Sequence, residues 1–270
     1  MTNILPAALT IAGSDSGGGA GIQADLRAFR DAGIHGCSAI TALTAQNPQT
    51  VTAVQTADAD IVRSQILTVT EGFTIKAVKT GMLANADIIR AVASCIPVLR
   101  VPWIVDPVMI STSGHALLDP PAVEDLRTLI LPNATLITPN LPETQALLGD
   151  ATMPLGNDAC RDAAIRLHQR YGCAVLVKGG HDPNDPAADW LCDTNGTATR
   201  LTAPAVPHPL TTHGTGCTLS AAIAARIALG YPLLNAVTAA KHYLCRLLAA
   251  ARPAGRDAVY PPNAAFPAEN

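Results

Sequence analysis

Short apolar segments alternate with helical segments along most of the chain, and this alternation restricts the possible folds more than any other feature. Apolar runs of strand length are followed by stretches whose apolar residues recur at helical spacing, as in Ile22, Leu26 and Phe29. Such alternation is typical of parallel strands joined by crossover helices. We expect strands at 8–12, 35–42, 51–55, 77–80, 101–105, 135–138 and 174–177, and helices at 22–32, 59–73, 86–96, 121–131, 142–148, 158–171 and 233–251.

The sequence therefore predicts one α/β domain over residues 1–270, with three layers: a mostly parallel central sheet and helices on both of its faces. A late hairpin is predicted where the Asn195-Gly196 turn joins extended segments at 189–193 and 197–202. The tail over 252–270 is rich in proline and alanine, and we expect it to pack loosely.

Polar residues follow the predicted carboxyl ends of several strands. They include the glycine-rich segment 13–21, Asp106, Asn140, Lys178 and the segment 214–217. In an open α/β sheet these strand ends meet at one edge, which is where ligands bind. Because several independent strand ends carry such residues, we expect a binding site there.

The segment 211–225 reads as a loop that runs directly into a buried helix, which should end near Gly230. Glycines and hydroxyl residues are followed by an alanine-rich apolar run. The start of a helix presents free N–H groups and a positive dipole end, which suit a phosphate. Gly214 and Gly216 would let the backbone approach a ligand closely. Cys217 would lie in the first turn, where the same field should lower its pKa.

The glycines of segment 13–21 match neither of two common phosphate motifs. Gly13 and Gly18 have the spacing of a P-loop, but Gly19 and Ala20 follow where lysine and a hydroxyl residue are required. A dinucleotide fingerprint that begins at Gly17 would need a third glycine where Ile22 stands. We therefore favour close approach of the backbone to a small ligand over a plain tight turn.

Phosphoryl transfer is the chemistry that these parts fit best. Lys178 precedes two glycines and could neutralise transferring phosphate oxygens. Asp106 and Glu143 could hold Mg²⁺ through oxygen or water, although each could also be a helix cap or a surface acid. Cys217 would take the proton from the attacking hydroxyl. A cysteine nucleophile paired with His213 is the competing interpretation, but glycines at a helix start suit an anion better than an acyl group.

Composition excludes several other classes. A net charge of −3 without a basic block gives no reason to expect nucleic acid binding. No apolar run approaches the roughly 20 residues of a membrane span, and Met1–Pro6 has no signal-peptide features. Seven cysteines without C-x-x-C spacing favour reduced thiols, so we expect a cytoplasmic protein.

Seven blocks of sequence, in order along the chain, resemble the hydroxymethylpyrimidine/phosphomethylpyrimidine kinases of thiamine biosynthesis. This is the branch of the ribokinase superfamily that carries cysteine where most members have aspartate. The blocks are AGSDSGGGAGIQAD from residue 12, ITALTAQN from residue 40, KTGML from residue 79, VDPVM from residue 105, ITPNLPE from residue 137, and VKGGH from residue 177 with HGTGCT from residue 213.

The resemblance implies a ribokinase-like fold and the use of Mg²⁺ and ATP to phosphorylate 4-amino-5-hydroxymethyl-2-methylpyrimidine twice, to the monophosphate and then to the diphosphate. It assigns residues to three parts of a site. Those on the substrate are Gln46, Gly13, Asp25, Met82 and Val108. Those on Mg·ATP are Asp106, Asn140, Glu143, Lys178 and Thr215, and Cys217 with Gly214 and Gly216 serves the transfer itself. A homodimer is expected because dimers are common in this family.

Three departures from the family pattern leave questions open. His115 stands where a small or acidic residue is common, Pro48 replaces a usual threonine, and the C-terminal segment lacks the family's Gly-x-Gly and histidine ending. The main alternative substrate is pyridoxal or pyridoxine, because close relatives with the same parts phosphorylate both rings. A catalytically silent binding protein on the same fold is the alternative from another class.

Overall fold

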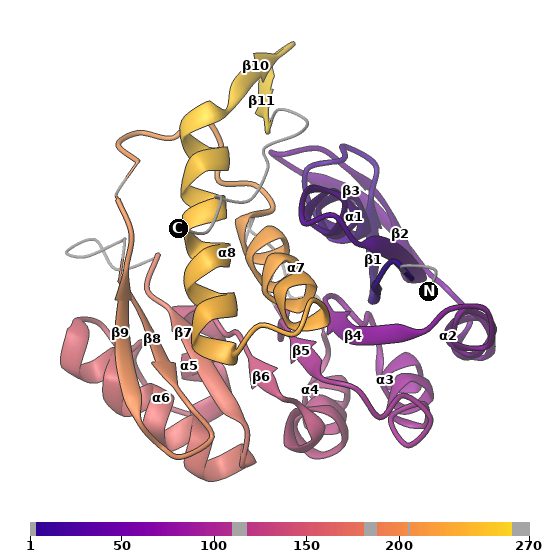
Figure 1. Ribbon diagram of the computed structural model, residues 1–270, viewed down its shortest axis with the longest axis horizontal. Coiled ribbons are helices and arrows are strands. Elements are labelled where there is room, and N and C mark those ends of the chain that lie inside the picture. Colours follow the sequence, from indigo (N-terminus) through magenta and orange to yellow (C-terminus); the bar gives the residue numbers. More distant parts are fainter. Residues whose placement is uncertain (1–3, 110–117, 181–187, 205, 261–270) are drawn as a thin grey trace.

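A nine-stranded sheet forms the centre of the molecule (Figure 1). The structure is a computed structural model that describes residues 4–109, 118–180, 188–204 and 206–260. The strand order is β3-β2-β1-β4-β5-β6-β7-β8-β9. The strands are β1 Ala7–Asp15, β2 His35–Gln46, β3 Val51–Thr56, β4 Ile75–Thr80, β5 Trp103–Val105, β6 Leu136–Ile137, β7 Ala174–Lys178, β8 Ala188–Cys192 and β9 Ala198–Thr202. The six central strands β2, β1, β4, β5, β6 and β7 are parallel. β3 at one edge and β8 and β9 at the other are joined to them by antiparallel pairing.

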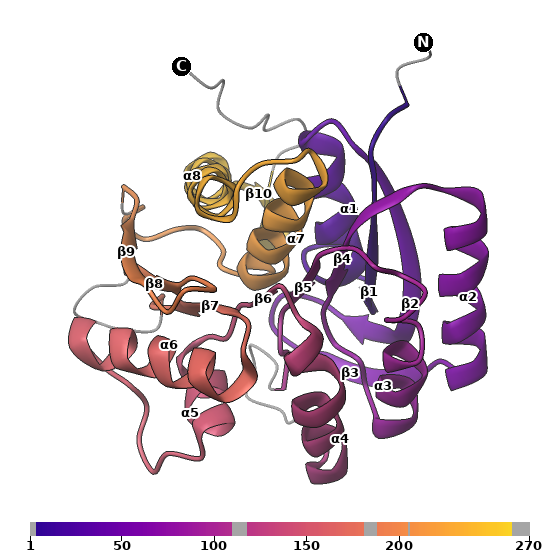
Figure 2. The same ribbon diagram turned by 60° about the horizontal axis from the view of Figure 1, so that its bottom comes forward.

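Helices cover both faces of the sheet, as predicted (Figures 1 and 2). The helices α1 Gly21–Asp31, α7 Thr215–Ala228 and α8 Leu233–Ala250 pack together on one face. The other face carries α2 Ala59–Gly72, α3 Ala86–Ala93, α4 Pro120–Asp125, α5 Leu141–Leu148 and α6 Asn157–Tyr171. Each interface has its own apolar core. Ile223 of α7 and Tyr243 of α8 are fully buried in one core, and Ile66 of α2 and Ile89 of α3 are fully buried in the other.

Most element boundaries agree with the sequence prediction to within a few residues, but two strands are longer. β1 continues through Gly13 to Asp15, and β2 continues to Gln46 because β3 pairs with it antiparallel in a hairpin. The helix expected over 121–131 begins one residue earlier and changes to a π-helical turn at Leu126–Ile130. These differences arise from partner strands and packing that lie outside the local sequence.

The described part of the tail contains a short hairpin, β10 Arg252–Ala254 and β11 Asp257–Val259. Tyr260, which follows it, is only 6% exposed. Residues 261–270 lie outside the described part of the chain, and so does His115.

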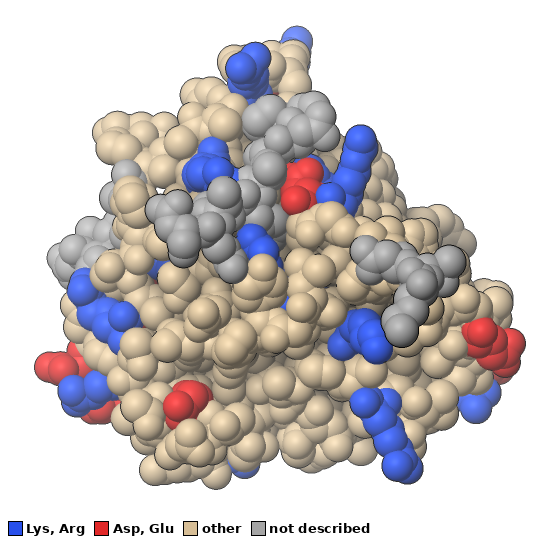
Figure 3. Space-filling view, in the orientation of Figure 1, with Lys and Arg blue, Asp and Glu red and all other residues tan. Residues whose placement is uncertain are grey.

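The face drawn in Figure 3 carries Lys and Arg side chains that are scattered among uncharged residues rather than gathered in one patch. Among the helices that the structure describes, none combines the length and apolar character that crossing a bilayer requires.

Candidate active site

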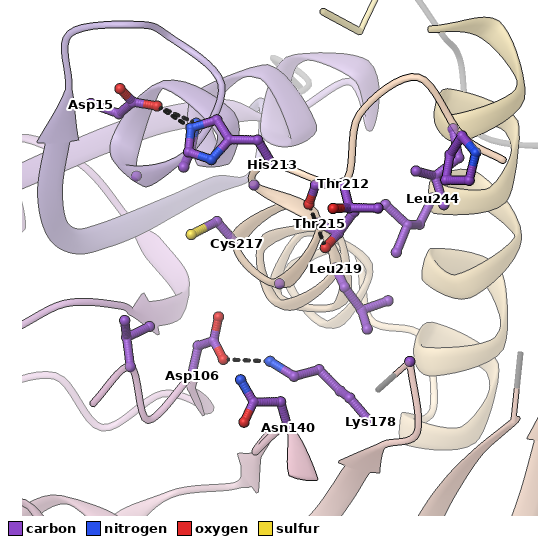
Figure 4. Close-up of a pocket in the computed structure, with 18 of the residues that line it drawn as sticks. Asp15, Asp106, Asn140, Lys178, Thr212, His213, Thr215, Cys217, Leu219 and Leu244 are labelled. Atoms are coloured by element: carbon purple, nitrogen blue, oxygen red, sulfur yellow. Dashed lines mark hydrogen bonds and ion pairs between the residues drawn. The ribbon is translucent and has the colours of Figure 1, made fainter. Parts of the chain in front are cut away.

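The carboxyl ends of β1, β2 and β4–β7 open into one cavity of about 1040 Å³, which the start of α7 closes on one side (Figure 4). The cavity is lined by Gly13, Gln46, Met82, Asp106, Val108, Asn140, Glu143, Lys178, Gly214, Thr215, Gly216 and Cys217. Every predicted site residue except Asp25 therefore contributes to this cavity. For Gln46, Met82, Asp106, Asn140 and Lys178 the convergence follows from the sheet, because each stands at or just after a strand end, whereas Gly214–Cys217 are brought to the cavity by the start of α7.

The start of α7 is an open anion-binding position. Gly214 is its N-cap and adopts a left-handed backbone with φ 77°, and no side chain of the described residues caps the helix. A Cβ on Gly214 would lie 2.0 Å from the carbonyl oxygen of Gly19. A Cβ on Gly216 would lie 3.3 Å from Lys178 Nζ. Gly214 is thus required for close packing, whereas a side chain at Gly216 would only make Lys178 shift slightly. The uncapped N–H groups face a cavity that an anion could enter.

Asp15 and His213 join the glycine loop, defined here as residues 15–21, to the anion loop, residues 211–217. Asp15 accepts hydrogen bonds from the N–H groups of Gly17, Gly19 and Ala20, and from His213 Nε2 at 2.8 Å. Burial by itself raises the pKa of Asp15, but the His213 bond and these N–H groups outweigh it, and the net shift is downward.

The sequence analysis did not predict that Asp15 and His213 form a pair. Asp15 lies within the glycine-rich block and His213 precedes Gly214, but the two residues are far apart in the chain. The only available signal was that an acid and a histidine each border a glycine motif.

Lys178, at the end of β7, forms an ion pair with Asp106. The distance from Nζ to Oδ1 is 2.8 Å, and Thr138 Oγ1 and Ser220 Oγ also donate to the carboxylate at 3.3 and 3.4 Å. Burial alone lowers the pKa of Lys178, but Asp106 and Glu143 attract the charge and the net shift is upward. Lys178 is therefore a fixed cation at physiological pH.

Asn140 and Glu143 form a capping box at the start of α5. Asn140 Oδ1 accepts from the N–H of Glu143, and Glu143 Oε2 accepts from the N–H of Asn140, both at 2.8 Å. Glu143 is 3% exposed, and this burial raises its pKa to about 7, against the attraction of Lys178. Asp106 adds repulsion. Two oxygen-bearing acids that repel each other beside a cavity are a suitable setting for Mg²⁺ held with phosphate and water.

Cys217 corrects one prediction. We expected the helix start to lower its pKa, but burial of the thiol raises the pKa to about 11, and Lys79 only partly opposes this. The field of a helix terminus is worth about 1 kcal/mol, whereas desolvation can shift a pKa by several units. In the ligand-free protein Cys217 is therefore a neutral thiol.

Asp25 lies behind the cavity rather than in it. Its carboxylate is fully buried, accepts from Thr10 Oγ1 at 2.6 Å and pairs with the equally buried Lys79 at 2.8 Å. Burial alone lowers the pKa of Lys79, but Asp25 holds its charge and the net shift is upward. Lys79 opens the block at residue 79, yet sequence reasoning gave it no role, because its partner is 54 positions away.

The substrate residues gather where β1 and β2 end. Gln46 Oε1 accepts from Thr44 Oγ1 at 3.0 Å, and the backbone of Gln46 exchanges hydrogen bonds with Ser16 Oγ. A Cβ on Gly13 would lie 2.7 Å from Met82 Cε, so Met82 packs directly over the glycine. This end of the cavity offers one amide and apolar surface, which suit a small ring with donors and acceptors.

Leu219 and Leu244 lie across the cavity from Asp15 (Figure 4). Leu248 and Pro209 also line the cavity, as do Lys241 and Asp189, which form an ion pair. Asp189 also accepts from the N–H of Gly179 at 2.9 Å, which fixes the turn that follows Lys178.

Comparison with known proteins gives one consistent result. The family model described as "Phosphomethylpyrimidine kinase" matches residues 15–262. The chain is 48% identical over 245 residues to the hydroxymethylpyrimidine/phosphomethylpyrimidine kinase of Rhizobium meliloti, covering 90% of this chain and 91% of that protein. It also resembles two solved structures. Pyridoxal kinase of Bacillus subtilis, in complex with ADP, has a TM-score of 0.85 and 35% identity over 95% of this chain and 97% of that one. Phosphomethylpyrimidine kinase of Clostridium difficile has a TM-score of 0.78 and 39% identity over 89% and 98%.

Proposed function

The chain belongs to the phosphomethylpyrimidine kinase family, and from that premise we propose how its cavity carries out the reaction. The protein is a kinase that transfers the terminal phosphoryl group of ATP to hydroxymethylpyrimidine and then to the monophosphate, in thiamine biosynthesis. In the first step the hydroxyl oxygen forms a bond to the γ-phosphorus while the bond from that phosphorus to the β–γ bridging oxygen breaks. In the second step a phosphate oxygen of the monophosphate forms a bond to the γ-phosphorus of a second ATP, and the bond from that phosphorus to the β–γ bridging oxygen breaks, which releases ADP.

The single observation that supports this assignment is the meeting of a glycine-lined helix start, a fixed lysine and a cysteine in one cavity. The N–H groups at Gly214–Cys217 would hold the phosphoryl group, and Lys178 would neutralise its oxygens. Cys217 Sγ, once ionised, would accept the proton of the attacking hydroxyl. The pyrimidine would lie beside Gln46 between Met82 and Val108, with Gly13 beneath it.

The nucleotide would occupy the side of the cavity lined by leucines, with its base against Leu219, Leu244 and Leu248. Asp106 and Glu143 would hold Mg²⁺, with Asn140 beside them and Thr215 on the phosphates. The metal would neutralise the phosphate oxygens and keep them aligned. The repulsion between the two acids supports this placement, because a cation between them removes the cost that raises the pKa of Glu143.

Asp25 would act on the substrate only from behind. It is fully buried, does not line the cavity, and holds Lys79 in an ion pair. We also propose a homodimer and a cytoplasmic location for this enzyme.

Pyridoxal is the competing acceptor, because the structural relative from Bacillus subtilis carries that name. The test is a product assay with purified protein, ATP, Mg²⁺ and either alcohol, in which the mono- and diphosphate are separated. We expect pyrimidine-dependent ATP consumption and both phosphorylated products. A kcat/KM for pyridoxal a hundredfold higher than for the pyrimidine would overturn the choice of substrate.

A further inference from the structure

Tyr260, which follows the C-terminal hairpin, contacts the anion loop directly and reaches the glycine loop through Arg27. Phosphoryl transfer needs these loops at a fixed spacing, because under the proposed function one borders the alcohol and the other holds the phosphoryl group. Inside the cavity the spacing is set by Asp15 and His213. On the outside it is set by Arg27 and Tyr260, which neither line the cavity nor belong to any block of the family pattern noted above.

Arg27, on α1, fastens the back of the glycine loop. Its guanidinium donates to the carbonyl oxygens of Gly18 at 3.3 Å and of Gly19 at 3.4 Å. On the other side of the loop the N–H of Gly19 donates to Asp15, so the loop is held from both sides. Gly19 is also the residue whose carbonyl oxygen abuts Gly214. A shift of the guanidinium would therefore displace Gly19 and, through it, Gly214 at the start of α7.

Tyr260 holds that guanidinium in place. Its ring lies over Arg27, with 5.5 Å from the guanidinium carbon to the ring centroid. Its hydroxyl donates to the carbonyl oxygen of Thr211, in the anion loop, at 3.5 Å. The side chain is 6% exposed, and burial raises its pKa to about 12, so the hydroxyl remains a donor at physiological pH. Tyr260 thus contacts the anion loop directly and is linked to the glycine loop through Arg27.

The same segment reaches a third element at the substrate end. Gln49, in the turn between β2 and β3, donates through Nε2 to Asp257 Oδ1 on β11. That turn begins immediately after Gln46. Figure 1 shows how the hairpin can do this: β10 and β11 stand at the carboxyl end of α8, where the chain turns back toward the body of the molecule.

We propose that Tyr260, acting through Arg27, is a positioning residue for phosphoryl transfer, and that residues 252–260 form a strap that keeps the glycine loop and the anion loop at their working distance. The proposal rests on the proposed function for its readout. The strap touches no ligand, so its loss should affect alignment in the transfer step rather than the binding of either substrate. Misalignment of about 1 Å can cost up to about a hundredfold in rate, and a cation–π contact contributes about 0.5–2 kcal/mol.

The test compares full-length Tyr260→Ala, Tyr260→Phe and Arg27→Met with the wild type, at a temperature at which each is folded. We expect Tyr260→Ala and Arg27→Met to lower kcat by about tenfold, with KM for ATP and for the pyrimidine within about twofold. Tyr260→Phe keeps the ring and should retain kcat within about threefold. The double variant should lower kcat by less than the product of the two single effects, because both single variants remove the shared contact between Arg27 and Tyr260. Arg256→Ala, an exposed change in the same hairpin, is the matched control.

Two results would contradict the proposed role of the strap. One is a lowered melting temperature with kcat unchanged in both Tyr260→Ala and Arg27→Met, which would make the contact purely structural. The other is a rise in either KM with kcat unchanged. If Tyr260→Ala does not fold, Arg27→Met, which leaves the tail intact, decides in the same way. Absence of turnover in the wild type would instead reject the proposed function.

Discussion

Replacing Glu143 with glutamine should raise the unfolding free energy of the ligand-free protein, relative to the wild type, by more at alkaline pH than at acidic pH. The pKa of Glu143 is raised from 4.5 to about 7 in the folded protein, mainly by burial and further by Asp106. A raised pKa means that folding favours the protonated acid. The contribution of Glu143 to stability is therefore complete below pH 4.5 and is lost as the pH rises through about 7.

The size of the effect follows from the shift. At about 1.4 kcal/mol per pKa unit, ionising Glu143 in the folded protein costs about 3 kcal/mol, most of which develops between pH 5 and pH 8. Glutamine keeps the shape and can accept the N–H of Asn140, but it never ionises. The difference in unfolding free energy between Glu143→Gln and the wild type should therefore rise by about 2.5 kcal/mol from pH 5 to pH 8.

The assay is urea unfolding at a series of pH values without nucleotide or Mg²⁺. Glu71→Gln, which changes an exposed side chain, shows what any such exchange does at the surface. Saturating Mg²⁺ and ATP should reduce the difference, because a cation beside Glu143 favours its ionised form. A difference that stays constant from pH 5 to pH 8 without ligands would refute the burial argument and remove the reason for placing Mg²⁺ there.

Four further predictions concern Cys217, Lys178 and Lys79. Cys217→Ser should bind both substrates normally but lower kcat by roughly 10²–10⁴, and an unchanged kcat would leave the backbone N–H groups as the whole of that site. With its raised pKa of about 11, Cys217 should also react with iodoacetamide at pH 8 more slowly than free cysteine does. Lys178→Ala should lower kcat with little change in pyrimidine affinity, and an effect on that affinity alone would place Lys178 at the wrong end of the cavity. Lys79→Met should cost about 3–5 kcal/mol of unfolding free energy by leaving Asp25 buried and unpaired, and Asp25→Asn in the same chain should recover part of it.

Much of the fold and most of the cavity could be predicted from the sequence for one physical reason. In a parallel sheet every strand delivers its last residues to the same edge, so a polar residue after an apolar run is already placed. Lys178 and Asp106 were found in this way, and they form an ion pair in the structure. Glu143 was found through its position one turn into a helix.

The features that were not predicted depend on pairs of residues distant in the chain. The raised pKa of Cys217 comes from the atoms that surround it, while the sequence shows only the helix start beneath it. Lys79 looks like the end of a strand until Asp25 is placed beside it. β2 appears to end at residue 42 until β3 extends its ladder to Gln46. In each case local residues set the element, and a tertiary partner sets its length or its charge.

The glycines show most clearly what a sequence leaves undetermined. The glycine-rich segment and the segment that contains Gly214 each looked like a separate cradle for a ligand. In the structure, Gly19 and Gly214 lie where the two loops pack closely against each other. A Cβ on Gly19 would lie 2.4 Å from the His213 ring, and a Cβ on Gly214 would lie 2.0 Å from the Gly19 carbonyl oxygen. A side chain at either position would therefore push the two loops apart. These glycines set the distance across which the phosphoryl group would travel, and Asp15 and Arg27 hold that distance from its two sides.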